Sequence, residues 1–143
     1  MRLRRQVPSA VLLIAVSCIV LADSPRADHP IIGTWTLTLP ILSCSETYRF
    51  RSNGMVHTTS GDEVGESIYV ISCYPSAKQF YKWVDTITKT NGKRDCAGQM
   101  VPVGDQATNF IRFDETGDRI FVCQSESNDS CLGPLRRVSR PSA

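Results

Sequence analysis

Apolar and polar side chains alternate in the stretch IIGTWTLTLP, residues 31–40. Trp35, Leu37 and Leu39 fall on one side of an extended segment, and the threonines between them fall on the other. A period of two residues is typical of a β-strand with one buried face. The pattern therefore predicts a half-buried strand at the start of the folded domain.

The same alternation recurs along the chain, with turn-forming residues such as Asn53-Gly54 and Asn91-Gly92 between the apolar stretches. No stretch beyond the first residues has the apolar period of a helix of three turns. About eight short strands joined by tight turns predict an all-β protein, an antiparallel up-and-down meander that closes into a small barrel. The expected strands span residues 31–40, 45–51, 55–60, 67–74, 80–90, 109–113, 119–123 and 134–138.

One connection is longer than a turn. Residues 95–107 carry the apolar sequence Met-Val-Pro-Val in their middle. A loop of this length either takes part in binding or folds against the barrel end and buries its own apolar side chains. Both interpretations remain open at this stage.

The N-terminus has the order of a secretory signal: Arg2, Arg4 and Arg5, then an apolar run, then small residues ending at Ala22. The run is too short to cross about 30 Å of hydrocarbon as a helix, so no transmembrane segment is expected in the mature chain. An alternative is processing as a lipoprotein through Cys18. The expected organisation is a cleaved signal peptide (1–22), a flexible lead-in (23–30), the barrel domain (31–138) and a polar tail (139–143).

Charge adds little once the signal is set aside. The full chain has 16 Lys and Arg against 14 Asp and Glu, and the signal removes three arginines and no acid. The remaining domain is close to neutral and has no basic stripe, which argues against a nucleic-acid partner.

Five cysteines lie beyond the signal. Behind an export signal they indicate a disulfide framework, and their spacing does not fit a zinc or redox motif. We expect one bridge between Cys123 and Cys131 and a second between Cys44 and Cys96, which would leave Cys73 as an odd thiol. This chemistry suits a periplasmic or extracellular location.

The Gly33-x-Trp35 motif and the late pair Arg136-Arg137 resemble the calycin superfamily, the lipocalins and their barrel relatives. The resemblance implies an up-and-down barrel in which a late arginine packs over the strand-one tryptophan and closes one end. The stretches CSETYRF, NGKRDCAG, FIRFDETGDRIFVC and CLGPLRR are also similar to a group of small exported bacterial proteins described as lipocalin-like. That second resemblance implies a bacterial envelope location and no particular activity.

Catalysis and metal binding find little support in the sequence. His57 near Asp62 and Glu63 lacks a nucleophile on a strained turn, so a surface histidine is expected. Residues 114–118 offer carboxylates without the spacing of a calcium loop, which favours a solvated hairpin turn. We therefore expect no catalytic residues, no metal site and no cofactor.

Two carboxylates fall on apolar faces. Glu46 shares its side with Tyr48, and Asp85 shares its side with Tyr81 and Trp83. A carboxylate beneath aromatic side chains needs a partner or a wet end of the barrel. The pair either orients a ligand in a pocket, or forms internal ion pairs with Arg112 or Arg137, or is turned outward by a bulge.

Two functions fit these features. The first is a non-catalytic exported protein that holds a small amphipathic molecule at the barrel mouth, with the aromatic residues as contact surface and the two carboxylates as orienting groups. The second is an inhibitor or immunity factor that binds an envelope hydrolase through residues 95–107 and the loop between Cys123 and Cys131.

Overall fold

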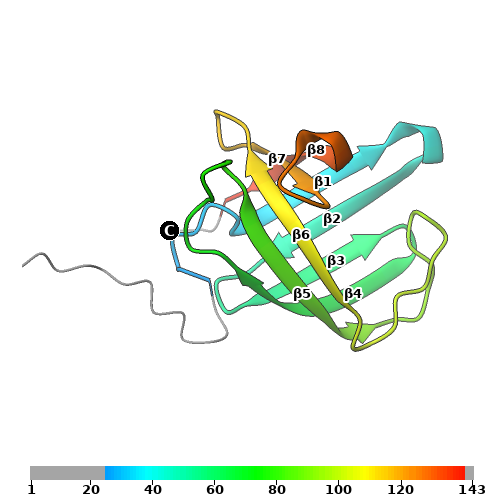
Figure 1. The fold of residues 1–143 in the computed structure, drawn as a ribbon. Helices are drawn as coiled ribbons and strands as arrows, with labels where there is room; N and C mark the ends of the chain where they lie inside the picture. The colour runs from blue at the N-terminus through cyan, green and yellow to red at the C-terminus, as the bar shows by residue number, and fades with distance from the viewer. Residues whose placement is uncertain (1–24, 141–143) are drawn as a thin grey trace, which may run out of the picture.

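The computed structural model describes residues 25–140, and the expected signal peptide and the last residues lie outside them. Eight β-strands dominate this part of the chain (Figure 1). The strands are β1 (Gly33–Leu39), β2 (Cys44–Phe50), β3 (Met55–Ser60), β4 (Glu63–Ile71), β5 (Tyr81–Thr90), β6 (Gln106–Phe113), β7 (Arg119–Cys123) and β8 (Cys131–Ser139).

Helical structure in residues 25–140 is confined to two single 3₁₀ turns, η1 (Pro40–Leu42) and η2 (Asn128–Ser130). No helix in this part of the chain is long and apolar enough to cross a lipid bilayer.

Each strand pairs antiparallel with its neighbours in the sequence, and β1 pairs with β8 to close the barrel. The predicted fold class, an all-β up-and-down meander closed into a barrel, is confirmed. Closure gives every strand two partners, so no strand edge is left unpaired. The remaining question is how the inward-facing side chains fill the interior.

The strand limits differ from the sequence prediction mainly in β4. The sequence pattern predicts a strand that begins at residue 67, but only Gly61 and Asp62 form the turn, and β4 begins at Glu63. Ser60 then pairs with Glu63 across a two-residue hairpin, and both side chains are buried. The acidic residue concealed the strand start, because a carboxylate on an inward position breaks the apolar alternation.

One end of the barrel is closed by Trp35 and Arg137, which pair in register across the β1–β8 seam. The guanidinium carbon of Arg137 lies 4.1 Å from the indole centroid, and Trp35 is fully buried. Of the two arginines proposed for closure, Arg137 therefore makes the stack. Arg136 is exposed and pairs with Thr36 on the outer face.

Arg137 also gathers backbone carbonyls at this end. Its Nη2 donates to Pro30 O at 2.8 Å and Gly117 O at 3.0 Å, and its Nη1 donates to Ile32 O at 3.1 Å. Its Nε faces Asp118 Oδ1 at 3.2 Å without the alignment of a hydrogen bond. The charge and the N–H groups of Arg137 together hold two chain segments on the stack, residues 30–32 and the turn at residues 117–118.

Residues 25–32, most of which were assigned to the lead-in, cross the closed end. His29 is 3% exposed; its Nδ1 accepts from the amide of Ile31, and its Nε2 lies 3.1 Å from Ser72 O. Burial lowers the pKa of His29, which favours the neutral ring that this arrangement needs. Trp35 Nε1 donates to Ile31 O at 2.8 Å, which joins the segment to the stack.

Both expected disulfides are present. Cys44 is bonded to Cys96 and Cys123 to Cys131. The second bridge joins facing residues of β7 and β8, and the first joins β2 to the loop between β5 and β6. Cys73 is not a free thiol, so the expectation of an odd thiol there is wrong.

We expect Arg137→Ala to lower the free energy of unfolding by about 2–3 kcal/mol, since it removes the cation–π contact and leaves three carbonyls without their donor. Arg136→Ala, one residue away and exposed, is the matched control and should change stability by no more than about 0.5 kcal/mol. Urea denaturation followed by Trp fluorescence measures both. Equal losses in the two variants would contradict the role given to the stack.

Candidate functional site

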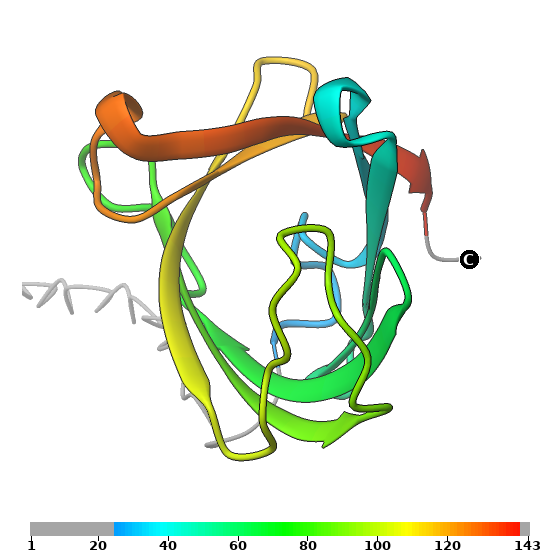
Figure 2. The ribbon, with the colours of Figure 1, turned by 90° about the vertical axis from the view of Figure 1, so that its right-hand side faces the viewer.

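The strand order places four connections at the end of the barrel opposite Arg137. They are residues 40–43, 61–62, 91–105 and 124–130. Figure 2 looks into this open end and shows the 91–105 loop lying across the mouth, with the N-terminal segment crossing the far end. Both disulfides lie at the open end, and the Cys44–Cys96 bridge fixes its longest loop to the barrel wall.

A polar chamber of about 220 Å³ lies inside this end. Strands β2 to β6 line it with carboxylates and small side chains, and the 91–105 loop contributes two residues. The carboxylates belong to Glu46, Glu63, Asp85 and Asp95, and the small residues include Ser60, Gly65, Ser67 and Ala107. Small residues on inward positions leave the space that larger ones would fill.

An apolar chamber of about 190 Å³ adjoins it. Tyr48, Trp83 and Asn109 line both chambers, so the two are neighbours across these three side chains. The remaining walls of the apolar chamber come from β2, β7 and β8. They are Phe50, Ile120, Val122, Leu132 and Leu135.

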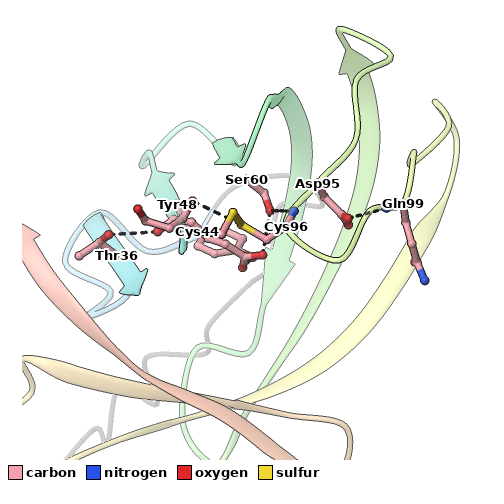
Figure 3. Close-up of a disulfide and its surroundings, with 9 residues drawn as sticks. Thr36, Cys44, Tyr48, Ser60, Asp95, Cys96 and Gln99 are labelled. Carbon is pink, nitrogen blue, oxygen red and sulfur yellow. Dashed lines mark hydrogen bonds between the residues drawn. A yellow bond between two sulfur atoms is a disulfide. The ribbon is translucent and has the colours of Figure 1, made fainter. Parts of the chain in front are cut away.

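Figure 3 shows Ser60 and Tyr48 beside the Cys44–Cys96 bridge. Both of these side chains donate hydrogen bonds to Glu46. Tyr48 Oη donates to its Oε2 at 2.7 Å, and Ser60 Oγ donates to its Oε1 at 2.8 Å. Ser60 Oγ in turn accepts from the amide of Cys96 at 3.0 Å. The Cys44–Cys96 bridge is thus connected to the orientation of the Glu46 carboxylate.

Asp85 is the most perturbed acid of the chamber. Burial raises its pKa to about 6, and a hydrogen bond from the Ser67 hydroxyl opposes the rise only in part. A carboxyl with a pKa near neutrality holds its charge at a cost in free energy. Carboxyl groups with a strongly raised pKa are common in binding and active sites.

Glu63 was not among the predicted site residues. It is 7% exposed, and burial, with the nearby charges of Asp95 and Glu46, raises its pKa. Ser60 pairs with Glu46 on one side and with Glu63 on the other. The sequence would have placed Glu63 in the site only if the strand had been predicted to begin at residue 63, four residues before the expected start.

No cation neutralises these acids within residues 25–140. The ion pairs of the described chain join Arg26 to Asp28, and Arg137 and Arg140 to Asp118. Arg112, the other proposed partner, lies over the Phe121 ring at 5.6 Å. The internal ion pairs considered from the sequence are therefore absent, and Asp85 faces the chamber rather than being turned outward.

The indole N–H of Trp83 also lacks a hydrogen-bond partner. The residue is only 5% exposed. The ring packs edge-on against Phe50 at 5.2 Å between centroids and against Tyr48 at 6.5 Å. A buried N–H without an acceptor costs about 1–3 kcal/mol, and such groups are rare in folded proteins.

The other sequence candidates lie elsewhere. Tyr81 is near the closed end, 5.0 Å from the His29 ring and 5.6 Å from Phe113, and lines neither chamber. His57 pairs with Arg49 and Glu66 on the outer face. Asp114 accepts hydrogen bonds from Thr116 within its own hairpin turn.

Among the described residues, no three His, Cys, Asp or Glu side chains converge closely enough to hold a metal ion. Comparison of the chain with protein-family models, with curated proteins and with solved structures finds no match. The chambers are therefore interpreted from their own geometry and chemistry.

We expect Asp85→Asn to raise the free energy of unfolding at pH 7.5 by about 1 kcal/mol. The folded-state pKa of Asp85 lies above its unfolded value, so its charge destabilises the fold at neutral pH, and the penalty fades as pH falls from 6 toward 4. The gain should shrink over that range. Asp105→Asn, exposed on the loop, is the control. Urea denaturation across this pH series would contradict the cause if the variant lost stability at pH 7.5.

Proposed function

We propose that this chain is a non-catalytic exported binding protein of lipocalin-like type, which holds a small amphipathic ligand inside the open end of its barrel. The observation that carries the proposal is the pair of adjoining chambers, one polar and one apolar, which share Tyr48, Trp83 and Asn109. A ligand with a polar head and an apolar tail matches that division.

The size of the space supports a small ligand. Pockets for drug-sized molecules measure roughly 300–1,000 Å³, and each chamber is smaller, at about 220 and 190 Å³. The aromatic core of Trp35, Phe50 and Tyr69 occupies the rest of the barrel. A long lipid chain does not suit this interior.

The lipocalin-like assignment is supported by the Gly33-x-Trp35 strand, the stack of Arg137 on Trp35 and the up-and-down order. Gly33 has a φ of 135°, and a Cβ there would lie 2.7 Å from Ser139 O, so the motif needs glycine. Export is supported by the two described disulfides, which suit an oxidising extracellular or periplasmic compartment.

A binding role is preferred to catalysis because of the residues that line the two chambers. The titratable groups lining the chambers are carboxylates and the Tyr48 phenol, and burial raises the pKa of that phenol. Tyr48 is already donating to Glu46. His57, the histidine considered for a relay, is on the outer face.

The purified oxidised protein should show a thermal shift with at least one member of a panel of small amphipathic amines, alcohols and carboxylates. Leu132→Trp, which fills the apolar chamber, should abolish the shift. Val138→Trp lies on the same strand but outside both chambers and should leave the shift intact. Absence of a shift with every compound would contradict the proposal.

The rival function, inhibition of an envelope hydrolase, is favoured by one observation. Apolar side chains project from two connections that the Cys44–Cys96 bridge joins: Ile41 is 98% exposed, and Met100 is 58% exposed. Disulfide-fixed apolar loops suit protein binding because their ordering cost is met in advance.

Recovery of a single stoichiometric hydrolase from envelope extract would support the rival function. Ile41→Ser should then abolish recovery, whereas Val138→Ser, an exposed apolar residue on the β8 face, should not. If both variants recover it equally, the loops do not form the interface.

A further inference from the structure

The polar chamber concentrates negative charge without an internal counter-charge. Its lining holds Glu46, Glu63, Asp85 and Asp95 and includes no Lys, Arg or His. Tyr48 and Ser60 supply hydrogen bonds to Glu46 but no positive charge. Among the described residues no cation pairs with these partly buried carboxylates, so a cation entering the chamber would gain ion pairs with them.

Trp83 supplies an independent indication of a ligand. Its Nε1–H is buried without an acceptor, and its side chain lines both chambers. An acceptor oxygen supplied by a ligand would remove the cost of this unpaired donor. The Asn109 side chain also lines both chambers, and its amide offers further donors.

The apolar chamber fixes the other end of the ligand. Tyr48, Phe50 and Trp83 supply aromatic surface, and Ile120, Val122 and Leu135 supply aliphatic surface. The space suits a single ring or a short branched chain. A positive head also gains cation–π attraction if it lies near the indole or phenol face.

We propose, on the basis of the binding function above, that the ligand is a small amphipathic amine with three parts in order. Its ammonium group lies among the carboxylates of the polar chamber, a hydroxyl or carbonyl oxygen accepts from Trp83 Nε1, and its apolar group fills the apolar chamber. Such a site rejects neutral and anionic analogues of the same shape, because these leave the carboxylates unpaired or repel them.

The pH dependence of binding follows from the same groups. The acids facing Asp85 from neighbouring elements are Glu46 on β2, Glu63 on β4 and Asp95 on the loop, and no basic residue lines the chamber. Protonation of Asp85, whose pKa is raised to about 6, removes part of the attraction. Amine affinity therefore falls as pH is lowered from 7.5 to 5.

Four isosteric probes test the class: 2-amino-1-phenylethanol, 1-phenylethane-1,2-diol, mandelate and 2-phenylethylamine. The first carries the ammonium, hydroxyl and ring in the proposed order; the next two replace the charge, and the last lacks the hydroxyl. We expect calorimetry to give the amino alcohol an affinity about tenfold or more above the diol and mandelate, and several-fold above phenylethylamine.

Substitutions of residues that line the chambers test which side chain contacts each part of the ligand. Asp85→Asn and Glu46→Gln should each weaken the amino alcohol about tenfold and leave the diol unchanged, whereas Glu115→Gln, on the turn at the closed end, should change neither. Trp83→Phe keeps the ring but removes the N–H, so it should erase the preference for the hydroxyl.

The outcomes separate the two proposals. If the diol or mandelate binds as tightly as the amino alcohol, the amine assignment is wrong while the binding function stands. If none of the four binds and the wider amphipath panel also fails, both are wrong. Saturable binding of Ca²⁺ alone that is lost in Asp85→Asn would reassign the chamber to a metal ion and overturn the amine assignment.

Discussion

Closure of the barrel forces alternate side chains of every strand into one shared space, and this constraint governs the rest of the molecule. At one end the inward positions carry large groups, and Arg137 stacked on Trp35 closes it. At the other end Ser60, Gly65 and Ser67 take inward positions. Because β-strands cannot turn a side chain outward without a bulge, residue size along each strand sets where space remains.

The polar interior of the open end lowers the stability of the fold. Carboxylates without an ion-pair partner in the described residues, a pKa of about 6 at Asp85 and an unpartnered Trp83 N–H each lower the free energy of unfolding. A barrel maintained only for stability would have apolar residues at these positions. The closed end shows the contrast, since there the buried polar group His29 has hydrogen-bond partners on both sides. Local costs of this kind are common at functional sites, which is the basis of the binding function proposed above.

The barrel fold could be predicted from the sequence because the alternation of apolar and polar residues is a local pattern. Within each strand, this pattern alone identifies the side chains that face inward. For the same reason it placed Glu46 and Asp85 on the inner face. Glu63 was missed because the turn-like sequence Gly-Asp-Glu concealed the start of the strand. Tyr81 was wrongly placed in the site because alternation does not show which end of a strand lies at the mouth of the barrel. The burial of His29 depends on contacts with a distant loop, which no local pattern records.

The Cys44–Cys96 bridge contributes to the geometry of the acidic chamber. Cys44 and Glu46 share one face of β2, and the amide of Cys96 donates to the Ser60 hydroxyl that itself donates to Glu46. The bridge therefore holds the 91–105 loop, which carries Asp95, beside the other acids. For the proposed binding function, ordering these groups in advance would lower the entropic cost of binding. The disulfide thus acts on the chamber as well as on the stability of the barrel, because the loop that completes the chamber has its covalent attachment to the wall at that point.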